Sequence, residues 1–132
     1  MGLILDTSVL VASRRRRFDL AKTLRGYADM EIGIAAITAA ELVRGMANAR
    51  ESARTARRFY VEGLLEHVPV LPFGLAEARE YGRIWAGLAN RETSVGTHHL
   101  MIAATALSLD WALMTLNPGE FEPVDGLVIA PL

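Results

Sequence analysis

Short apolar runs alternate with helix-like stretches along this chain, and this alternation constrains the fold more than any other sequence feature. The runs are Leu3–Leu5, Glu31–Ile34, Val68–Leu71, Ala112–Met114 and Leu127–Ile129. Short strands that alternate with helices are typical of a parallel sheet covered on both faces. We therefore expect an α/β fold, a three-layer α/β/α sandwich around a short, mostly parallel central sheet.

Apolar residues at helical spacing and capping residues indicate where the helices lie. The expected helices begin near Val9 and then span Phe18–Tyr27, Thr38–Asn48, Arg50–Glu66, Leu75–Asn90 and His98–Leu109. Asp6 is a candidate cap for the first helix. Thr38 and Glu41 have the spacing of a capping box. Pro69 and Pro72 indicate that the third strand lies at a sheet edge or ends there.

Length and composition narrow the class of protein. The 132 residues fit one domain, residues 1–132, and 52% of them are hydrophobic, which is enough for a core. The chain has no cysteine, which excludes disulfides and thiolate metal sites and is compatible with a reducing cytoplasm. No signal peptide or membrane-spanning stretch is visible, so we expect a cytoplasmic protein without membrane contact.

Charge gives a mixed indication of the partner. The formal net charge is −1, so no overall basic field marks a nucleic-acid-binding protein. However, Lys22 is the only lysine among 14 basic residues, and arginine matches phosphate groups with two parallel hydrogen bonds. The candidate phosphate contacts are Arg14–Arg17, Arg44 and the Arg50–Arg58 helix. A solvated helix face or a codon bias explains the same arginines without a ligand.

Four polar residues stand where a ligand site of a parallel sheet is expected, after strands or early on the next helix. Asp6 ends the first strand, Glu41 lies in the first turn of the helix after the second, His99 opens the helix before the fourth, and Asn117 follows the fourth. We expect them to converge on one pocket that suits a divalent cation. Taken singly, each has a purely structural explanation, as a cap, a capping-box partner, a helix-start histidine and a turn residue respectively.

Four segments in register resemble the motifs of PIN-domain ribonucleases. They are Leu5–Leu10 (LDTSVL), Thr38–Gly45 (TAAELVRG), Gly96–Leu107 and Thr115–Phe121 (TLNPGEF), with Val124–Leu127 similar to the family's closing turn. The match runs nearly end to end and is most similar to the VapC toxins of type II toxin–antitoxin pairs. The resemblance implies a PIN-like fold, RNA cleavage that depends on Mg²⁺ or Mn²⁺, and inhibition by a VapB-type antitoxin.

The resemblance also implies roles for single residues. Asp6, Glu41, His99 and Asn117 would be the catalytic and metal-binding positions, and Thr7, Ser8 and Thr115 would orient them or contact the scissile phosphate. The family's third acidic residue falls on His99, which replaces a hard oxygen donor with nitrogen and disfavours Mg²⁺ relative to Mn²⁺ or Zn²⁺. The exchange is either a natural tuning of metal preference or a substitution introduced to weaken a toxic nuclease.

Two other functions compete with the endoribonuclease. The first is a disabled PIN fold that binds antitoxin or RNA, which His99 favours. The second is a small flavodoxin-like regulator or phosphatase, which the absence of a glycine-rich phosphate loop disfavours. The excess of apolar residues for so small a chain also predicts a homodimer.

Overall fold

The computed structural model describes residues 1–132 and contains one four-stranded parallel sheet. The strands are β1 (Gly2–Leu5), β2 (Glu31–Ala35), β3 (Val70–Leu71) and β4 (Ala112–Met114). Their order across the sheet is β3-β2-β1-β4, and every pairing is parallel. The carboxyl ends of the two central strands therefore open at the same edge, where a ligand site was predicted.

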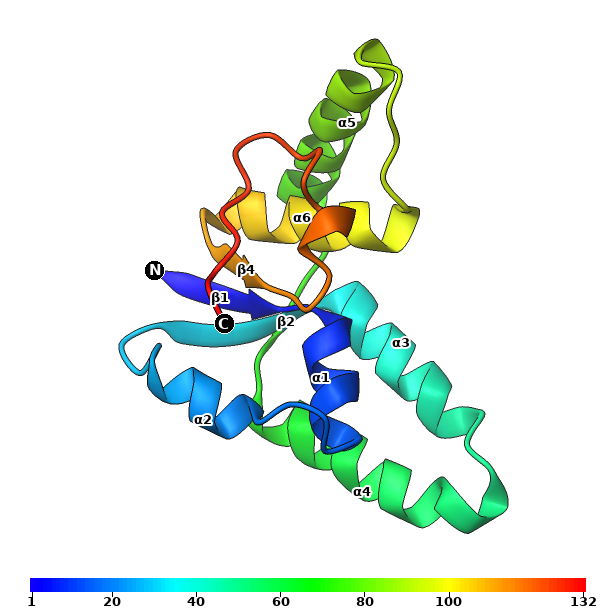
Figure 1. Ribbon diagram of the computed structural model, residues 1–132. Helices are drawn as coiled ribbons and strands as arrows, with labels where there is room; N and C mark the ends of the chain where they lie inside the picture. The colour runs from blue at the N-terminus through cyan, green and yellow to red at the C-terminus, as the bar shows by residue number, and fades with distance from the viewer.

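Helices cover both faces of the sheet, so the predicted three-layer α/β/α architecture is confirmed (Figure 1). Below the sheet in Figure 1 lie α1 (Thr7–Arg14), α2 (Leu20–Arg25), α3 (Ala36–Ala47) and α4 (Glu51–His67). Above it lie α5 (Leu75–Asn90), α6 (Thr97–Leu109) and the 3₁₀ turn η1 (Pro118–Glu120).

The strands divide the apolar side chains between two cores, because successive strand residues point to opposite faces. In β1, Ile4 packs with α5 and α6, whereas Leu3 and Leu5 pack with α1 and α4. In β4, Leu113 and Met114 divide in the same way. Strands buried on both faces explain why these runs are apolar without alternation.

The two sides of the sheet also differ in charge. Residues 1–67, here called the basic half, hold 11 Lys and Arg against 8 Asp and Glu. Residues 68–132, here called the acidic half, hold 3 against 7. The balanced net charge of the chain therefore conceals a separation of charge across the sheet.

Two predicted strands differ from the structure at the sheet edges. The prediction of a fifth strand at Leu127–Ile129 is wrong: only Ile129 forms a bridge, to Leu113, and β4 itself ends one residue later at Met114, which leaves little strand to pair with. The third is shorter than predicted, because it begins only after Pro69, although the Pro69 carbonyl still accepts a hydrogen bond from Ile34 N.

Two predicted helix ends are also wrong. α3 begins at Ala36 with Ala35 at its N-cap and no side-chain cap, so Thr38 is not the cap. Apolar residues run from β2 directly into α3, and no polar residue separates strand from helix. α2 is shorter than predicted because the Asp19 side chain caps it, accepting a hydrogen bond from Lys22 N at 3.0 Å.

No helix is both long enough and apolar enough to cross a membrane.

Candidate active site

Asp6 stands where β1 ends and α1 begins, and the backbone holds it from both sides. Its N–H donates to the Met114 carbonyl at 2.9 Å, which joins the end of β1 to β4. Its side chain caps α1, and the residue is only 2% exposed. Asp6 therefore caps α1 and also lies at the predicted site, so the two interpretations of this residue do not exclude each other.

Hydroxyl groups fix the Asp6 carboxylate in one orientation. Its Oδ2 accepts hydrogen bonds from Ser8 Oγ at 2.6 Å and from Thr115 Oγ1 at 2.8 Å, with a longer contact from Ser8 N at 3.4 Å. Its Oδ1 has no hydrogen-bond partner, and no unpartnered polar side-chain atom in the protein is buried, so Oδ1 reaches solvent. One oxygen thus positions the group and the other is free for a ligand.

The same hydroxyls fasten the loop after β4 to the site. Leu116 N donates to Ser8 Oγ at 3.0 Å, and Asn117 N donates to Thr115 Oγ1 at 3.0 Å. These bonds hold Asn117 beside the end of β1, although the two segments are more than a hundred residues apart in the chain. Ser8 and Thr115 therefore hold the Asp6 carboxylate and the Asn117 loop together, which is one of the two roles that the family resemblance implied for them.

Glu41 reaches the site from the second turn of α3. It is not the capping-box partner of Thr38, because the helix starts two residues before Thr38. Its Oε1 accepts a hydrogen bond from Thr7 Oγ1 at 2.9 Å, and the Thr7 hydroxyl also lies 3.2 Å from Thr38 Oγ1. The threonines of two helices thus position Glu41 toward the carboxyl edge of the sheet.

Two histidines lie in the first turn of α6, and each faces a different carboxylate, although only His99 lines the cavity described below. His98 Nδ1 lies 3.3 Å from Glu41 Oε2, and His99 Nδ1 lies 3.6 Å from Glu120 Oε2. The His99 ring packs edge-on against Phe121, with the ring centroids 5.1 Å apart. His99 is therefore oriented by the acidic half, and His98 by the basic half.

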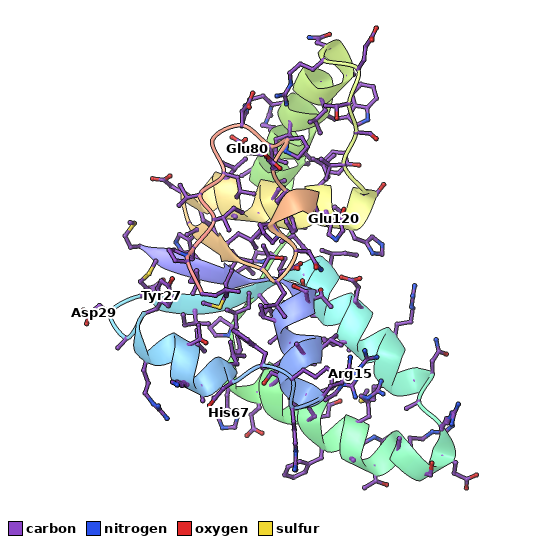
Figure 2. The ribbon with its side chains drawn as sticks, in the orientation of Figure 1. Arg15, Tyr27, Asp29, His67, Glu80 and Glu120 are labelled. Atoms are coloured by element: carbon purple, nitrogen blue, oxygen red, sulfur yellow. The ribbon has the colours of Figure 1, made fainter.

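A cavity of about 420 Å³ joins these groups. It is lined by all four predicted site residues, Asp6, Glu41, His99 and Asn117, and by Thr7, Ser8, Val11, Ala12, Arg15, Arg17, Ile102 and Leu116. Figure 2 shows Arg15 below the sheet at the end of α1 and Glu120, the last residue of η1, above it. The structure thus places the predicted residues on one cavity at the border between the two halves.

The donor set of the cavity is suited to a hard divalent cation with a partly open coordination shell. No three acidic or histidine side chains lie close enough to hold a metal by themselves. Magnesium sites, however, often use one or two carboxylates and fill the other positions with water and substrate phosphate. The free Asp6 oxygen, the Glu41 carboxylate and the Asn117 side chain fit that arrangement.

The model of the PIN domain family matches residues 3–127. This chain belongs to the PIN domain family. It is similar to "Ribonuclease VapC1" of Rickettsia felis, with 33% identity over 130 residues that cover 98% of this chain and 95% of that protein. It is also similar to "tRNA(fMet)-specific endonuclease VapC" of Shigella flexneri, with 31% identity over 134 residues that cover 96% and 95%.

A solved structure is similar over the same length. The DNA-bound VapBC structure from Salmonella typhimurium matches with a TM-score of 0.89 and 27% identity, covering 98% of this chain and 97% of that one. The similarity to the VapC group of PIN-domain proteins, predicted from four motifs, is therefore confirmed.

The sequence did not single out His98 or Glu120, nor the two members of the run Arg14–Arg17 that line this PIN-domain site. His98 was predicted only as the first residue of the helix His98–Leu109, yet it faces Glu41. Glu120 was part of a motif without a role, yet it faces His99. Arg15 and Arg17 belonged to a charge run, and nothing in the sequence separated them from Arg14 and Arg16, because the geometry of the chain turn decides which of the four line the cavity.

Proposed function

We propose that this PIN-domain protein is a metal-dependent endoribonuclease and the toxin of a type II toxin–antitoxin pair. The observation that carries the proposal is the cavity on which two separately positioned carboxylates converge, one after β1 and one on α3. The names of the VapC relatives, a ribonuclease and a tRNA-specific endonuclease, support RNA as the substrate.

The residues of the cavity would have two different roles in phosphodiester hydrolysis, metal binding and positioning. Asp6, Glu41 and Asn117, with His99 nearby, would hold Mg²⁺ or Mn²⁺, which when bound supplies an activated water and stabilises developing negative charge. Thr7, Ser8 and Thr115 keep the two carboxylates in place through hydroxyl hydrogen bonds. Such fixed positioning avoids reorganisation when substrate arrives.

Partners follow from the same proposal. The solved VapBC structures support a VapB-type antitoxin as the partner that restrains the activity. We also infer a homodimer, since α5 leaves Leu75 68% exposed and Trp85 59% exposed. We also propose a cytoplasmic location, which an RNA substrate and an antitoxin partner would require. Light scattering of the purified protein tests the dimer, and a monomer at tens of micromolar would contradict it.

The direct test of the proposal is RNA cleavage by the purified protein with Mg²⁺, with Mn²⁺ and with a chelator. Asp6→Asn keeps the size of the side chain and removes its charge, and it should reduce cleavage about a hundredfold or more. It should also abolish the heat of Mn²⁺ binding in isothermal titration. Asp29→Asn, at an exposed loop position, is the matched control and should leave both unchanged. Cleavage that resists the chelator would contradict metal dependence.

His99 favours a second candidate, a PIN fold that binds RNA or antitoxin without cleaving. This candidate predicts binding of RNA with no cleavage in either metal. The same assay therefore separates the two, provided that RNA binding is measured beside cleavage.

A further inference from the structure

The four consecutive arginines Arg14–Arg17 do not form one patch, because the chain turns sharply within the run. α1 ends in a Schellman motif, in which Arg16 N donates to Ser13 O and Arg17 N donates to Ala12 O. Arg16 occupies the left-handed position of the motif, with φ of 58°. The turn therefore sends neighbouring side chains in different directions.

Only two of the four arginines line the candidate active site. Arg15 and Arg17 border the cavity that contains Asp6 and Glu41. Arg16 and Arg17 border an adjoining hollow of about 480 Å³, which also includes Phe18 and Asp19. Arg17 is common to both, so the basic surface continues from the cavity into the hollow.

No carboxylate neutralises these arginines. The protein has four ion pairs between basic and acidic side chains, and they involve Arg83, Arg91, His98 and His99 but none of the four consecutive arginines. Asp19 caps α2 instead, through Lys22 N. The positive charge at the cavity is therefore available to an anion from outside.

Like charges also crowd behind the cavity. Burial lowers the pKa of Arg14, and the neighbouring guanidinium groups of Arg57 and Arg15 lower it further. Arg57 makes a hydrogen bond to the Gly45 carbonyl, which does not offset its charge. Such crowding is unfavourable in the free protein, and a bound anion would relieve it.

We propose that Arg15 and Arg17 bind the RNA phosphate next to the scissile one. The inference rests on the proposed function, because it assumes that the scissile phosphate lies at Asp6 and Glu41. A cavity of about 420 Å³ has the size of a small-molecule site, and its two walls carry opposite charge. Guanidinium groups bind phosphate through two parallel hydrogen bonds, which fixes the direction of the backbone across the site.

RNA explains the arrangement better than an acidic peptide. The carboxylates Asp6 and Glu41 of the cavity repel a peptide carboxylate and a phosphate alike, so the extent of the basic surface has to separate the two partners. A polynucleotide repeats its charge along the chain, and the basic surface continues past the cavity through Arg17. An extended phosphate backbone uses such a track, whereas a single carboxylate does not need it.

The test measures binding of a short fluorescent single-stranded RNA in chelator, so that neither metal nor cleavage contributes. Arg15→Gln/Arg17→Gln should weaken binding about tenfold or more, and it should reduce the slope of log K against log salt by about 1.4. The matched control is Arg79→Gln/Arg83→Gln on α5, which changes the net charge equally and should leave the slope unchanged. Arg15→Lys/Arg17→Lys should keep the slope of log K against log salt and lose part of the affinity for RNA. Because this variant changes the same two positions but keeps their charge, it separates the loss of charge from a folding defect.

Three results would overturn the inference. If the glutamine variant binds RNA with wild-type affinity and slope while the wild type cleaves RNA, the arginine assignment fails and the proposed function stands. If the wild type neither binds nor cleaves RNA, both fail together. If the glutamine variant loses binding of an acidic peptide but not of RNA, the surface serves a protein partner.

Discussion

The basic half and the acidic half of this protein differ in what they can offer a polyanion. The basic half carries the arginines of α1, α3 and α4, none of which forms an ion pair with a carboxylate. The acidic half pairs two of its three arginines within itself, Arg83 with Glu80 and Arg91 with Asp125. The carboxylates of the candidate site nevertheless come from the basic half. Under the proposed function, the arginines that would attract phosphate and the carboxylates that would hold the metal therefore both belong to the basic half.

The acidic half contributes shape and orientation instead. Its α6 supplies His98 and His99, and its last segment supplies Asn117 and Glu120, all at the cavity or facing a residue of the cavity. The largest fully buried side chain in the protein, Phe121, also lies there and contacts His99. Three predictions test whether the two halves contribute differently to the stability of the protein and to its candidate site.

The largest effect is expected from the core of the acidic half. Phe121→Ala should lower the free energy of unfolding by about 3–5 kcal/mol, because it leaves a cavity under η1 and α6. Phe59→Ala on α4, where the ring is 84% exposed, is the matched control and should change it by less than about 0.5 kcal/mol. Urea denaturation measures both. If both variants lose the same free energy of unfolding, the buried Phe121 does not stabilise the protein more than the exposed Phe59 does.

A middle-sized effect is expected at the wall where the halves meet. His99→Asp should tighten Mg²⁺ binding about tenfold, because a hard cation gains an anionic oxygen from the acidic half. It should also raise RNA cleavage in Mg²⁺ and the toxicity of the protein expressed without its antitoxin. Isothermal titration checks the affinity, with His67→Asp on α4 as a control of equal charge change. If affinity, cleavage and toxicity all stay the same, His99 does not face the metal.

The smallest effect is expected in the turn that separates the arginines. Arg16→Gly should raise the free energy of unfolding by about 0.5 kcal/mol, since a left-handed backbone strains any residue with a Cβ and the extra flexibility of the unfolded chain offsets part of the gain. Arg58→Gly, at an exposed position inside α4, should instead lower it by about 1 kcal/mol. Thermal melts measure both. If Arg16→Gly instead lowers the free energy of unfolding, the guanidinium group of Arg16 stabilises the turn by more than its left-handed backbone strains it.

The parts of the fold that sequence predicted well are those where one physical preference dominates. β4 has the predicted bounds, and β1 and β2 differ from them by one residue each, because strands buried on both faces must be apolar throughout. The convergence of Asp6, Glu41, His99 and Asn117 on one cavity was predictable because parallel strands end at a common edge.

The rest depended on contacts that a sequence does not display. Thr38 and Glu41 have the spacing of a capping box, but their partner is Thr7, which is more than thirty residues away. Leu127–Ile129 is as apolar as a strand, yet it meets β4 over a single residue. His98 and His99 are adjacent in the sequence, and only the packing of α6 against α3 and η1 gives them different carboxylates.

The cavity draws its lining from both halves, so whatever occupies it also joins them. A ligand that bridges Asp6 and Glu41 to the loop of Asn117 binds the folded chain and not the unfolded one. By mass action, a hundredfold excess over its dissociation constant would add about 2.7 kcal/mol to the stability of the chain. The resistance of this protein to proteases would then depend on whether the ligand is bound. A substitution that abolishes ligand binding would therefore shorten the lifetime of the protein and also lower its activity.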